Sequence, residues 1–186
     1  MVELRLGKKL VYHWIRVSIY KRGESLMTDT DKDKELKQQL EIQRIYVKDL
    51  SLETPNTPKI FKEEWRPEVS IDLDVQHSKI EDKIFEVTLS VTVTAKMKEE
   101  TAFLVEVKQA GIFYIDGFSE EQKDHLLNAY CPNVLFPYAR ECVSDFVTRA
   151  SFPPLNLAPV SFEALYMQQQ EEKKAAGEKT KEETKH

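Results

Sequence analysis

The sequence has little glycine, and it lacks long apolar runs. Only 5 of its 186 residues are glycine, so the glycine-rich loops that cradle phosphate groups in nucleotide-binding proteins are not expected. No apolar run approaches the roughly 18 to 20 residues that a membrane-spanning helix needs. The motifs GxxxxGKS/T, GxGxxG and HExxH are also missing. These absences argue against nucleotide-driven or zinc-dependent hydrolytic chemistry.

Residues able to carry chemistry are few and scattered. The two cysteines, Cys131 and Cys142, have no CxxC spacing, and we interpret them as reduced, partly buried side chains of a cytosolic protein. One alternative is a thiol enzyme in which His125 activates Cys142, but a single histidine on a helix is more often an ordinary surface residue. The histidines form no metal-ligand pattern, so we expect no metal ion and no cofactor. They are His13, His77, His125 and His186.

The net charge changes sharply after residue 26. Residues 1–26 hold six basic and two acidic side chains, a net charge of +4, whereas the remaining 160 residues hold 21 basic and 30 acidic side chains, a net charge of −9. The basic head is also rich in apolar residues, so one interpretation is an amphipathic segment that contacts a membrane or nucleic acid. A signal peptide fits poorly, because His13 and Arg16 interrupt the apolar stretch and no small-residue cleavage site follows.

We favour the interpretation that residues 1–26 result from a misassigned start codon and that translation begins at Met27. Residues 22–24 can be encoded by a purine-rich stretch that resembles a ribosome-binding site, and Met27 opens a polar run. On this interpretation, residues 27–41 form a disordered N-terminal arm.

Four segments after this arm have the pattern of β-strands. Residues 69–75 and 85–94 alternate apolar and polar side chains, which indicates one buried and one solvated face. Residues 42–53 and 101–115 are rich in β-forming residues and show the same period of two. The connection over residues 96–100 is short and polar, so we expect the third and fourth strands to pair antiparallel.

Helices are predicted after the strands. A capping box at Ser119 and Gln122 begins a short helix that runs to Tyr130. Pro137 suits the first turn of a second helix, in which apolar residues recur every three or four positions as far as Ala150.

A last helix is expected from Phe162 to about Lys174. The charged tail over residues 168–186 mixes lysine and glutamate, and we expect it to be frayed or disordered. Strands followed by helices predict one α+β domain over residues 42–167, with a four-stranded antiparallel sheet covered by helices on one face.

Two proline-rich apolar loops are the first candidates for a binding surface. Residues 55–67 join the first two strands, and residues 130–165 hold five of the eight prolines yet stay apolar. Proline breaks helices and central strands, so we expect residues 134–136 and 152–157 to be loops that flank the second helix. Such side chains can simply pin the loops to the core, but an exposed apolar patch would bind unfolded polypeptide without sequence specificity. The candidate contact residues are Ile60, Phe61, Trp65, Val134, Leu135, Phe136, Phe152, Leu155 and Leu157.

The second candidate surface is an acidic face of the sheet. The period of two places acidic side chains of all four strands on one face. This face is either an ordinary solvated surface or a docking surface for a basic partner. Its acidic residues are Asp49, Glu53, Asp72, Asp74, Glu86 and Glu106.

Three long stretches of the sequence are distinctive: QRIYVKDLSLETPNTPKIFKEEWRPEV, TVTAKMKEETAFLVEVKQAGIF and AYCPNVLFPYARECVSDFVTRASFPPLNLAPVSFEALY. Together they resemble the SecB family of bacterial protein-export chaperones. The resemblance runs without large gaps from about residue 42 to residue 167, and the last stretch makes it highly specific. The basic head is not part of the family pattern.

The resemblance implies a cytosolic, ATP-independent holdase that keeps precursor proteins unfolded and delivers them to the SecA translocation motor. It also implies a homotetramer, assembled as a dimer of dimers, whose clients bind in apolar grooves beside the two proline-rich loops. By the same resemblance, Asp49, Glu53, Leu104 and Glu106 dock SecA, and Val105, Val107 and Gln109 belong to the tetramer interface.

Two alternatives of related kind stay open. A SecB-like chaperone dedicated to a toxin–antitoxin system would share the fold, but it would have less reason to retain all four SecA-docking positions. A structural adaptor that binds no client would not suppress aggregation of unfolded proteins.

Overall fold

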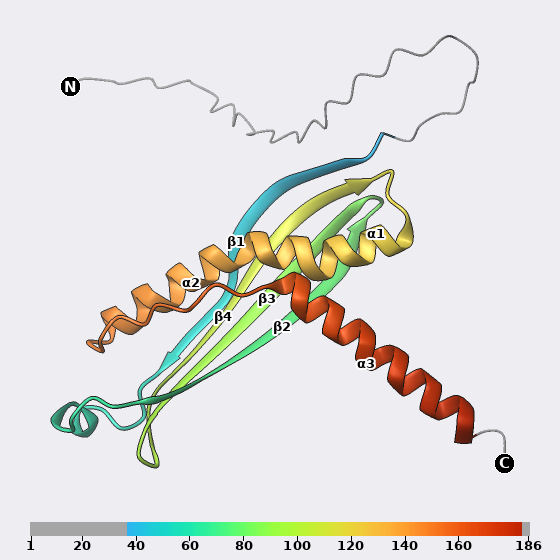
Figure 1. Cartoon of the computed structure of the whole chain (residues 1–186). Helices are drawn as coiled ribbons and strands as arrows, with labels where there is room; N and C mark the ends of the chain where they lie inside the picture. Colours follow the sequence, from blue (N-terminus) through green and yellow to red (C-terminus); the bar gives the residue numbers. More distant parts are fainter. Residues whose placement is uncertain (1–36, 184–186) are drawn as a thin grey trace, which may run out of the picture.

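A single antiparallel sheet of four strands organises the chain, in the order β1-β4-β3-β2 (Figure 1). The computed structural model describes residues 37–183, with side chains described as far as Lys173, so the predictions for the basic head and the start at Met27 lie outside the described residues. The strands are β1 (Gln39–Glu53), β2 (Glu68–Glu81), β3 (Ile84–Met97) and β4 (Glu100–Asp116). The predicted four-stranded antiparallel sheet is confirmed.

The strands are longer than their sequence patterns indicated. β1 begins at Gln39, so residues 39–41 of the predicted disordered arm belong to the sheet. β2 continues to Glu81 although residues 76–81 do not alternate. Antiparallel pairing with β3 satisfies the backbone of this segment whatever its side chains are. β1 and β2 are the two edges of the sheet.

One long helix crosses the sheet in three parts. It consists of α1 (Glu120–His125), a π-helical turn η2 (Leu126–Tyr130) and α2 (Cys131–Arg149). The predicted capping box is present, since the Ser119 hydroxyl accepts from the Gln122 amide N–H at 3.2 Å and the Gln122 side chain accepts from the Ser119 amide N–H at 3.0 Å.

Pro137 does not begin a helix, and this corrects the prediction for residues 134–136. It lies inside α2, and the proline near the first turn of α2 is Pro132. Pro137 and Asn133 are both exposed, so water can bind the Asn133 carbonyl that loses its helical donor. The segment expected to be a loop before the second helix is therefore helical.

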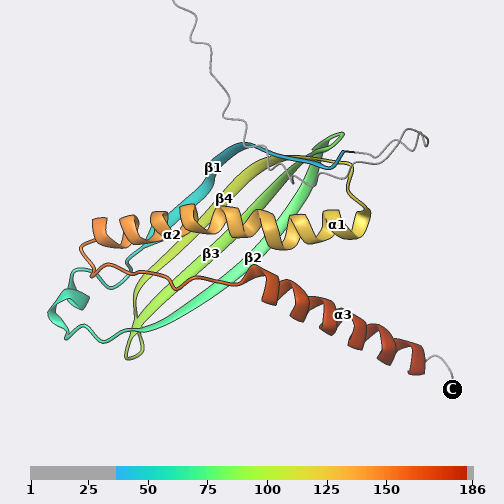
Figure 2. The same ribbon diagram turned by 45° about the horizontal axis from the view of Figure 1, so that its top comes forward.

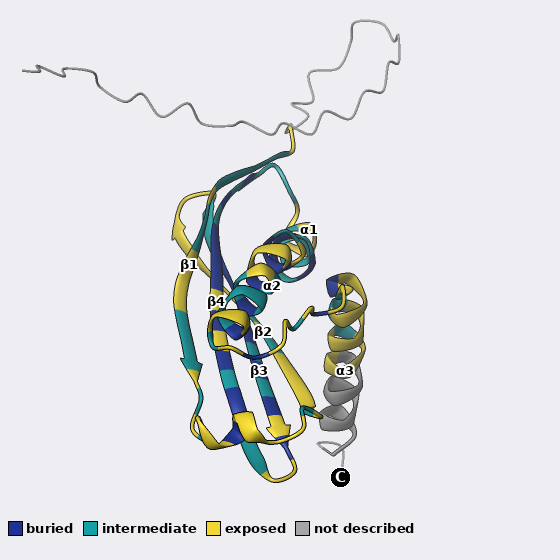
Figure 3. Cartoon of the chain, turned by 90° about the vertical axis from the view of Figure 1, so that its left-hand side faces the viewer, coloured by how far each residue is buried: buried dark blue, intermediate teal, exposed yellow. Residues whose placement is uncertain are grey.

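The core lies between the sheet and α2. The helix buries Leu135, Ala139, Val143 and Val147, which recur at a spacing of four and form one face. Figure 3 shows buried residues along the central strands beneath this helix. Helices thus cover one face of the sheet, as predicted. The sheet residues that they cover include Val87, Leu89, Val91, Val105, Val107 and Phe113.

The last helix, α3 (Phe162–Glu183), projects away from the sheet (Figures 1 and 2). An extended linker, residues 151–161, connects it to α2 and runs beside α2 on the same face of the sheet. The tail expected to be frayed or disordered from residue 168 is helical as far as Glu183, because glutamate, lysine, glutamine and alanine favour helix strongly. In the described part of the chain, every helix is too short or too polar to cross a membrane.

Candidate functional site

The two proline-rich loops meet in one aromatic cluster. The ring of Phe152, in the linker after α2, has its centroid 5.1 Å from Phe61 and 5.4 Å from Trp65, both in the loop between β1 and β2. It also lies 5.2 Å from the ring of Phe103 on β4. Tilted aromatic pairs at such distances stabilise packing beyond the area they bury. The structure therefore brings together two loops that are far apart in the sequence.

Most of the predicted client-contact residues are less accessible than the sequence indicated. Phe61 is 49% exposed, and Trp65, Val134 and Leu155 are half-buried. The other five are buried, because the linker and the loop fold onto the sheet and because residues 134–136 are part of α2. These five are Ile60, Leu135, Phe136, Phe152 and Leu157.

Two exposed apolar residues near the start of β2 are not among the predicted contact residues. Val69 and Ile71 are 39% and 46% exposed, although they pair with buried Ala95 and Val93 of β3 on the helix-bearing face of the sheet. Their alternation predicted a buried face, but α2 packs mainly on β4 and β3, and the long helix contacts β2 through η2. Val69 and Ile71, near the start of β2, stay exposed. Together with Phe61 and Trp65 they form what we call the apolar strip.

The four predicted SecA-docking residues lie together on the opposite face of the sheet. Glu53 of β1 pairs with Leu104 of β4, and Ser51 pairs with Glu106. Asp49, Glu53 and Glu106 are exposed, and Leu104 is half-buried between them. We call Asp49, Glu53, Leu104 and Glu106 the acidic patch. An apolar centre with an acidic rim suits a basic protein surface.

Glu86, also predicted on this face, is held by its own neighbours. It accepts hydrogen bonds from the Lys48 ammonium, at 2.7 Å, and from the Tyr46 hydroxyl. Both bonds lower the pKa of Glu86, and the bond to Glu86, together with burial, raises the pKa of Tyr46 to about 12. Because its side chain is only 18% exposed, Glu86 contributes to the sheet and not to the accessible acidic patch.

Comparisons with known proteins identify the family. The model of the family described as preprotein translocase subunit SecB matches residues 33–173. The protein-export protein SecB of Nitrosococcus oceani is 57% identical over 141 residues, which cover 75% of this chain and 86% of that relative. The chain belongs to the SecB family. It is an export chaperone.

A solved structure of a SecB-like protein confirms the α+β fold. It is a SecB-like chaperone of Mycobacterium tuberculosis in complex with a ChAD peptide from an antitoxin. The TM-score is 0.54 at 19% sequence identity, and the alignment covers 66% of this chain and 88% of that chain. At this identity the likeness concerns the fold alone.

The residues that the SecB resemblance placed in the tetramer interface are inside the protomer. Val105, Val107 and Gln109 are 0%, 1% and 2% exposed, on the face of β4 that α2 covers. Alternation along β4 turns them away from Leu104 and Glu106. Their side chains are too deeply buried to touch another protomer directly. The side-chain oxygen of Gln109 is buried without a hydrogen-bond partner among the described residues.

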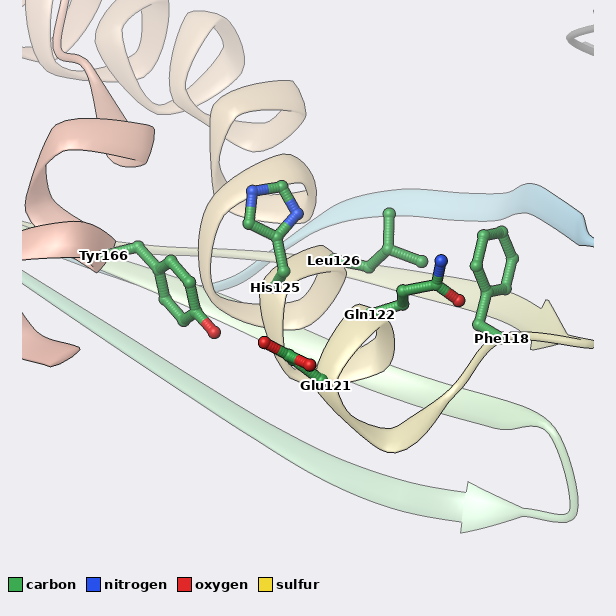
Figure 4. Close-up of a pocket in the computed structure, with 6 residues that line it drawn as sticks. All are labelled: Phe118, Glu121, Gln122, His125, Leu126 and Tyr166. Atoms are coloured by element: carbon green, nitrogen blue, oxygen red, sulfur yellow. The ribbon is translucent and has the colours of Figure 1, made fainter.

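A small pocket lies where α3 meets the first helix (Figure 4). Its volume is about 380 Å³. Next to it, the His125 ring lies 2.6 Å from the Glu163 carboxylate, and the Tyr166 hydroxyl donates to Asp124 at 2.8 Å. These contacts hold α3 on the body of the SecB fold, and they join residues about 40 positions apart that no sequence pattern connects. The pocket is lined by Phe118, Glu121, Gln122, His125, Leu126 and Tyr166.

The geometry contradicts a thiol enzyme that uses Cys142 and His125. The two residues belong to one long helix, and 17 residues at 1.5 Å each separate them by roughly 25 Å. Burial, followed by the nearby Glu141 and Asp145, raises the pKa of Cys142, whereas a reactive thiol needs a lowered one. Among the described residues, no group of histidine, cysteine, aspartate and glutamate side chains is arranged to hold a metal ion.

Proposed function

We propose that this export chaperone is an ATP-independent holdase that holds unfolded precursor proteins on the apolar strip and delivers them to SecA through the acidic patch. The main support for this proposal is that the two surfaces lie on opposite faces of the sheet. The apolar strip lies on the helix-bearing face of the sheet and the acidic patch on the opposite face. One molecule can therefore hold a client and contact a second protein at the same time.

Client holding rests on accessible apolar surface. Burial of such surface stabilises a complex by roughly 25 cal/mol per Å² without demanding a particular sequence, which suits a protein that binds many unfolded chains. Phe61, Trp65, Val69 and Ile71 supply the contact, and the half-buried Leu155 and Val134 stay further candidates. Of the buried residues of the predicted set, Phe152 supports the strip directly by its ring contacts with Phe61 and Trp65. The others belong to the hydrophobic core: Ile60, Leu135, Phe136 and Leu157.

Delivery rests on the acidic patch. Charged surfaces raise the rate of encounter with a partner of opposite charge and exclude partners of like charge. Glu53 and Glu106 supply this charge beside the apolar side chain of Leu104. In the absence of nucleotide-driven release, competition by SecA would free the client.

Assembly as a homotetramer, a dimer of dimers, would join several apolar strips. A client that binds one strip then meets the next at high effective concentration, so weak contacts add up to tight holding. Val105, Val107 and Gln109 would act on assembly by positioning α2, whose outer surface includes Tyr138 at 50% exposure. The proposed location is the cytoplasm, where precursors await export.

A reconstituted transfer assay tests the proposal. Purified protein is mixed with an unfolded, slowly folding precursor and then with SecA, and both complexes are measured by native mass spectrometry. Glu106→Lys should leave precursor capture unchanged and reduce SecA affinity by about tenfold or more, because a lysine replaces an exposed carboxylate. Failure of the unmodified protein to bind SecA, together with binding of an antitoxin, would favour the toxin–antitoxin alternative.

A further inference from the structure

The acidic patch has a positively charged neighbour on its own face. Lys108 pairs with Asp49 across the β1–β4 ladder, and its ammonium nitrogen lies 3.5 Å from the Asp49 carboxylate. It follows Glu106 by two positions on β4, so the two side chains share a face about 7 Å apart along the strand. A positive charge therefore lies beside the surface that the proposed function assigns to a basic partner.

The patch carboxylates are not equally neutralised. Asp49 has Lys108 as an ion-pair partner, whereas no ion pair to Glu53 or Glu106 occurs within residues 37–173. Lys108 thus weakens the negative field most at the Asp49 end of the patch and least at Glu53.

The ion pair of Lys108 contributes little to the stability of the fold. The side chains of Lys108 and Asp49 are 51% and 64% exposed, and ion pairs between such exposed groups contribute little to stability. Lys48 on the same face differs, because its partner Glu86 is mostly buried and also bound by Tyr46. The position of Lys108 points to binding and not to folding.

We propose that Lys108 is a specificity-determining residue that limits the affinity of the acidic patch for its basic partner. A basic group of SecA that approaches Asp49 must displace the Lys108 ammonium and is repelled by it. This inference rests on the proposed function. Its consequence is a docking surface that releases its partner readily, as repeated delivery requires.

The opposite role for Lys108 is a contact with an acidic group of the partner. The two roles predict opposite signs for removal of its charge. If Lys108 is a competitor for Asp49, its loss tightens SecA binding. If it is a contact, its loss weakens binding.

The test is a charge series at one position. Dissociation constants for SecA are measured for the unmodified protein, Lys108→Gln and Lys108→Glu at low and at high ionic strength. Lys108→Gln should bind roughly twofold to fivefold more tightly at low ionic strength, as expected for one charge about 6 to 8 Å away in a solvated setting. Lys108→Glu should bind more tightly still. Both gains should shrink at about 1 M salt, where charges are screened within about 3 Å.

Lys79→Gln is the matched control. Lys79 is also an exposed lysine in an ion pair, with its ammonium nitrogen 3.3 Å from Asp82, but it lies on β2, at the other edge of the sheet. The substitution changes the net charge of the chain by the same amount. It should leave SecA affinity unchanged, and all variants should capture precursor as the unmodified protein does.

The outcomes separate this inference from the proposed function. If the unmodified protein binds SecA and Glu106→Lys does not, the docking assignment stands. The inference about Lys108 is then overturned by unchanged or weaker binding of Lys108→Gln, or by an equal gain in Lys79→Gln, which would indicate an effect of total charge alone. If the unmodified protein does not bind SecA, the proposed function and this inference fail together.

Discussion

The two faces of β4 differ in what surrounds them. Val105 and Val107 face α2 and are buried, whereas Leu104 is half-buried and Glu106 is exposed on the outer face. Because successive side chains of a strand point to opposite faces, one short segment can carry both core and partner surface. Substitutions one residue apart should therefore separate stability from binding.

The largest expected effect is a loss of stability when a buried side chain on the inner face of the sheet is truncated. Phe113 is fully buried beneath the helices, and its neighbour Ile112 is half-buried on the outer face. Phe113→Ala should lower the free energy of unfolding by about 3 to 5 kcal/mol, and Ile112→Ala by only about 1 kcal/mol, since less surface is lost. Urea unfolding followed by circular dichroism at one fixed protein concentration measures both, because assembly would make stability depend on concentration. Equal losses would contradict the division into two faces.

Sequence alone predicted much of this division. Uninterrupted alternation in residues 85–94 placed the buried Val87, Leu89, Val91 and Val93 on one face of β3 correctly, but the opposite face is not uniformly solvated, because Thr88 is buried as well. The same reasoning failed on β2, where the apolar face carries exposed Val69 and Ile71. Alternation in the sequence predicts which residues share a face of the sheet. It does not predict which strands the helix covers.

The helical part of the site was harder to predict. The sequence pattern predicts a helix start at Pro137, but tertiary packing of Leu135 and Ala139 against the sheet outweighs the lost hydrogen bond. Contacts such as the aromatic cluster around Phe152 join distant segments, and local patterns contain no information on them. The resemblance to SecB named the four residues of the acidic patch, but it did not reveal that Val105, Val107 and Gln109 are buried.

A second prediction concerns the uncovered part of the inner face. Ile71 and Ile80 are both on β2 and are 46% and 50% exposed, but only Ile71 belongs to the apolar strip. Ile71→Ser should weaken the binding of an unfolded precursor by about tenfold, because the isoleucine side chain no longer buries apolar surface in the complex.

Ile80→Ser is the control and should leave capture unchanged at equal stability. Fluorescence anisotropy of a labelled, unfolded precursor measures both affinities. Comparable losses in the two variants would show that exposed apolar area anywhere on β2 suffices, and the apolar strip would no longer be a defined site.

The smallest expected effect is a pH-dependent loss of stability when the Glu86 carboxylate on the outer face is removed. Lys48 and then Tyr46 lower the pKa of Glu86 by hydrogen bonds to its carboxylate. A carboxylate whose pKa is lowered on folding adds stability above its unfolded pKa, about 4.3, and this contribution is lost as the pH falls through the folded value. Glu86→Gln should therefore cost about 1 kcal/mol or less at pH 7. The difference from the unmodified protein should shrink as the pH falls below the unfolded pKa of about 4.3 and disappear below the lowered folded pKa.

Urea midpoints measured at a series of pH values test this, with Glu106→Gln as the control, because Glu106 has no ion pair within residues 37–173. If Glu86→Gln is destabilised equally at pH 7 and at pH 3, the lost interaction is not that of a carboxylate with Lys48. If Glu106→Gln shows the same pH dependence as Glu86→Gln, the two carboxylates do not differ in their interactions with the sheet. The distinction between a bound Glu86 and an available Glu106 would then be wrong.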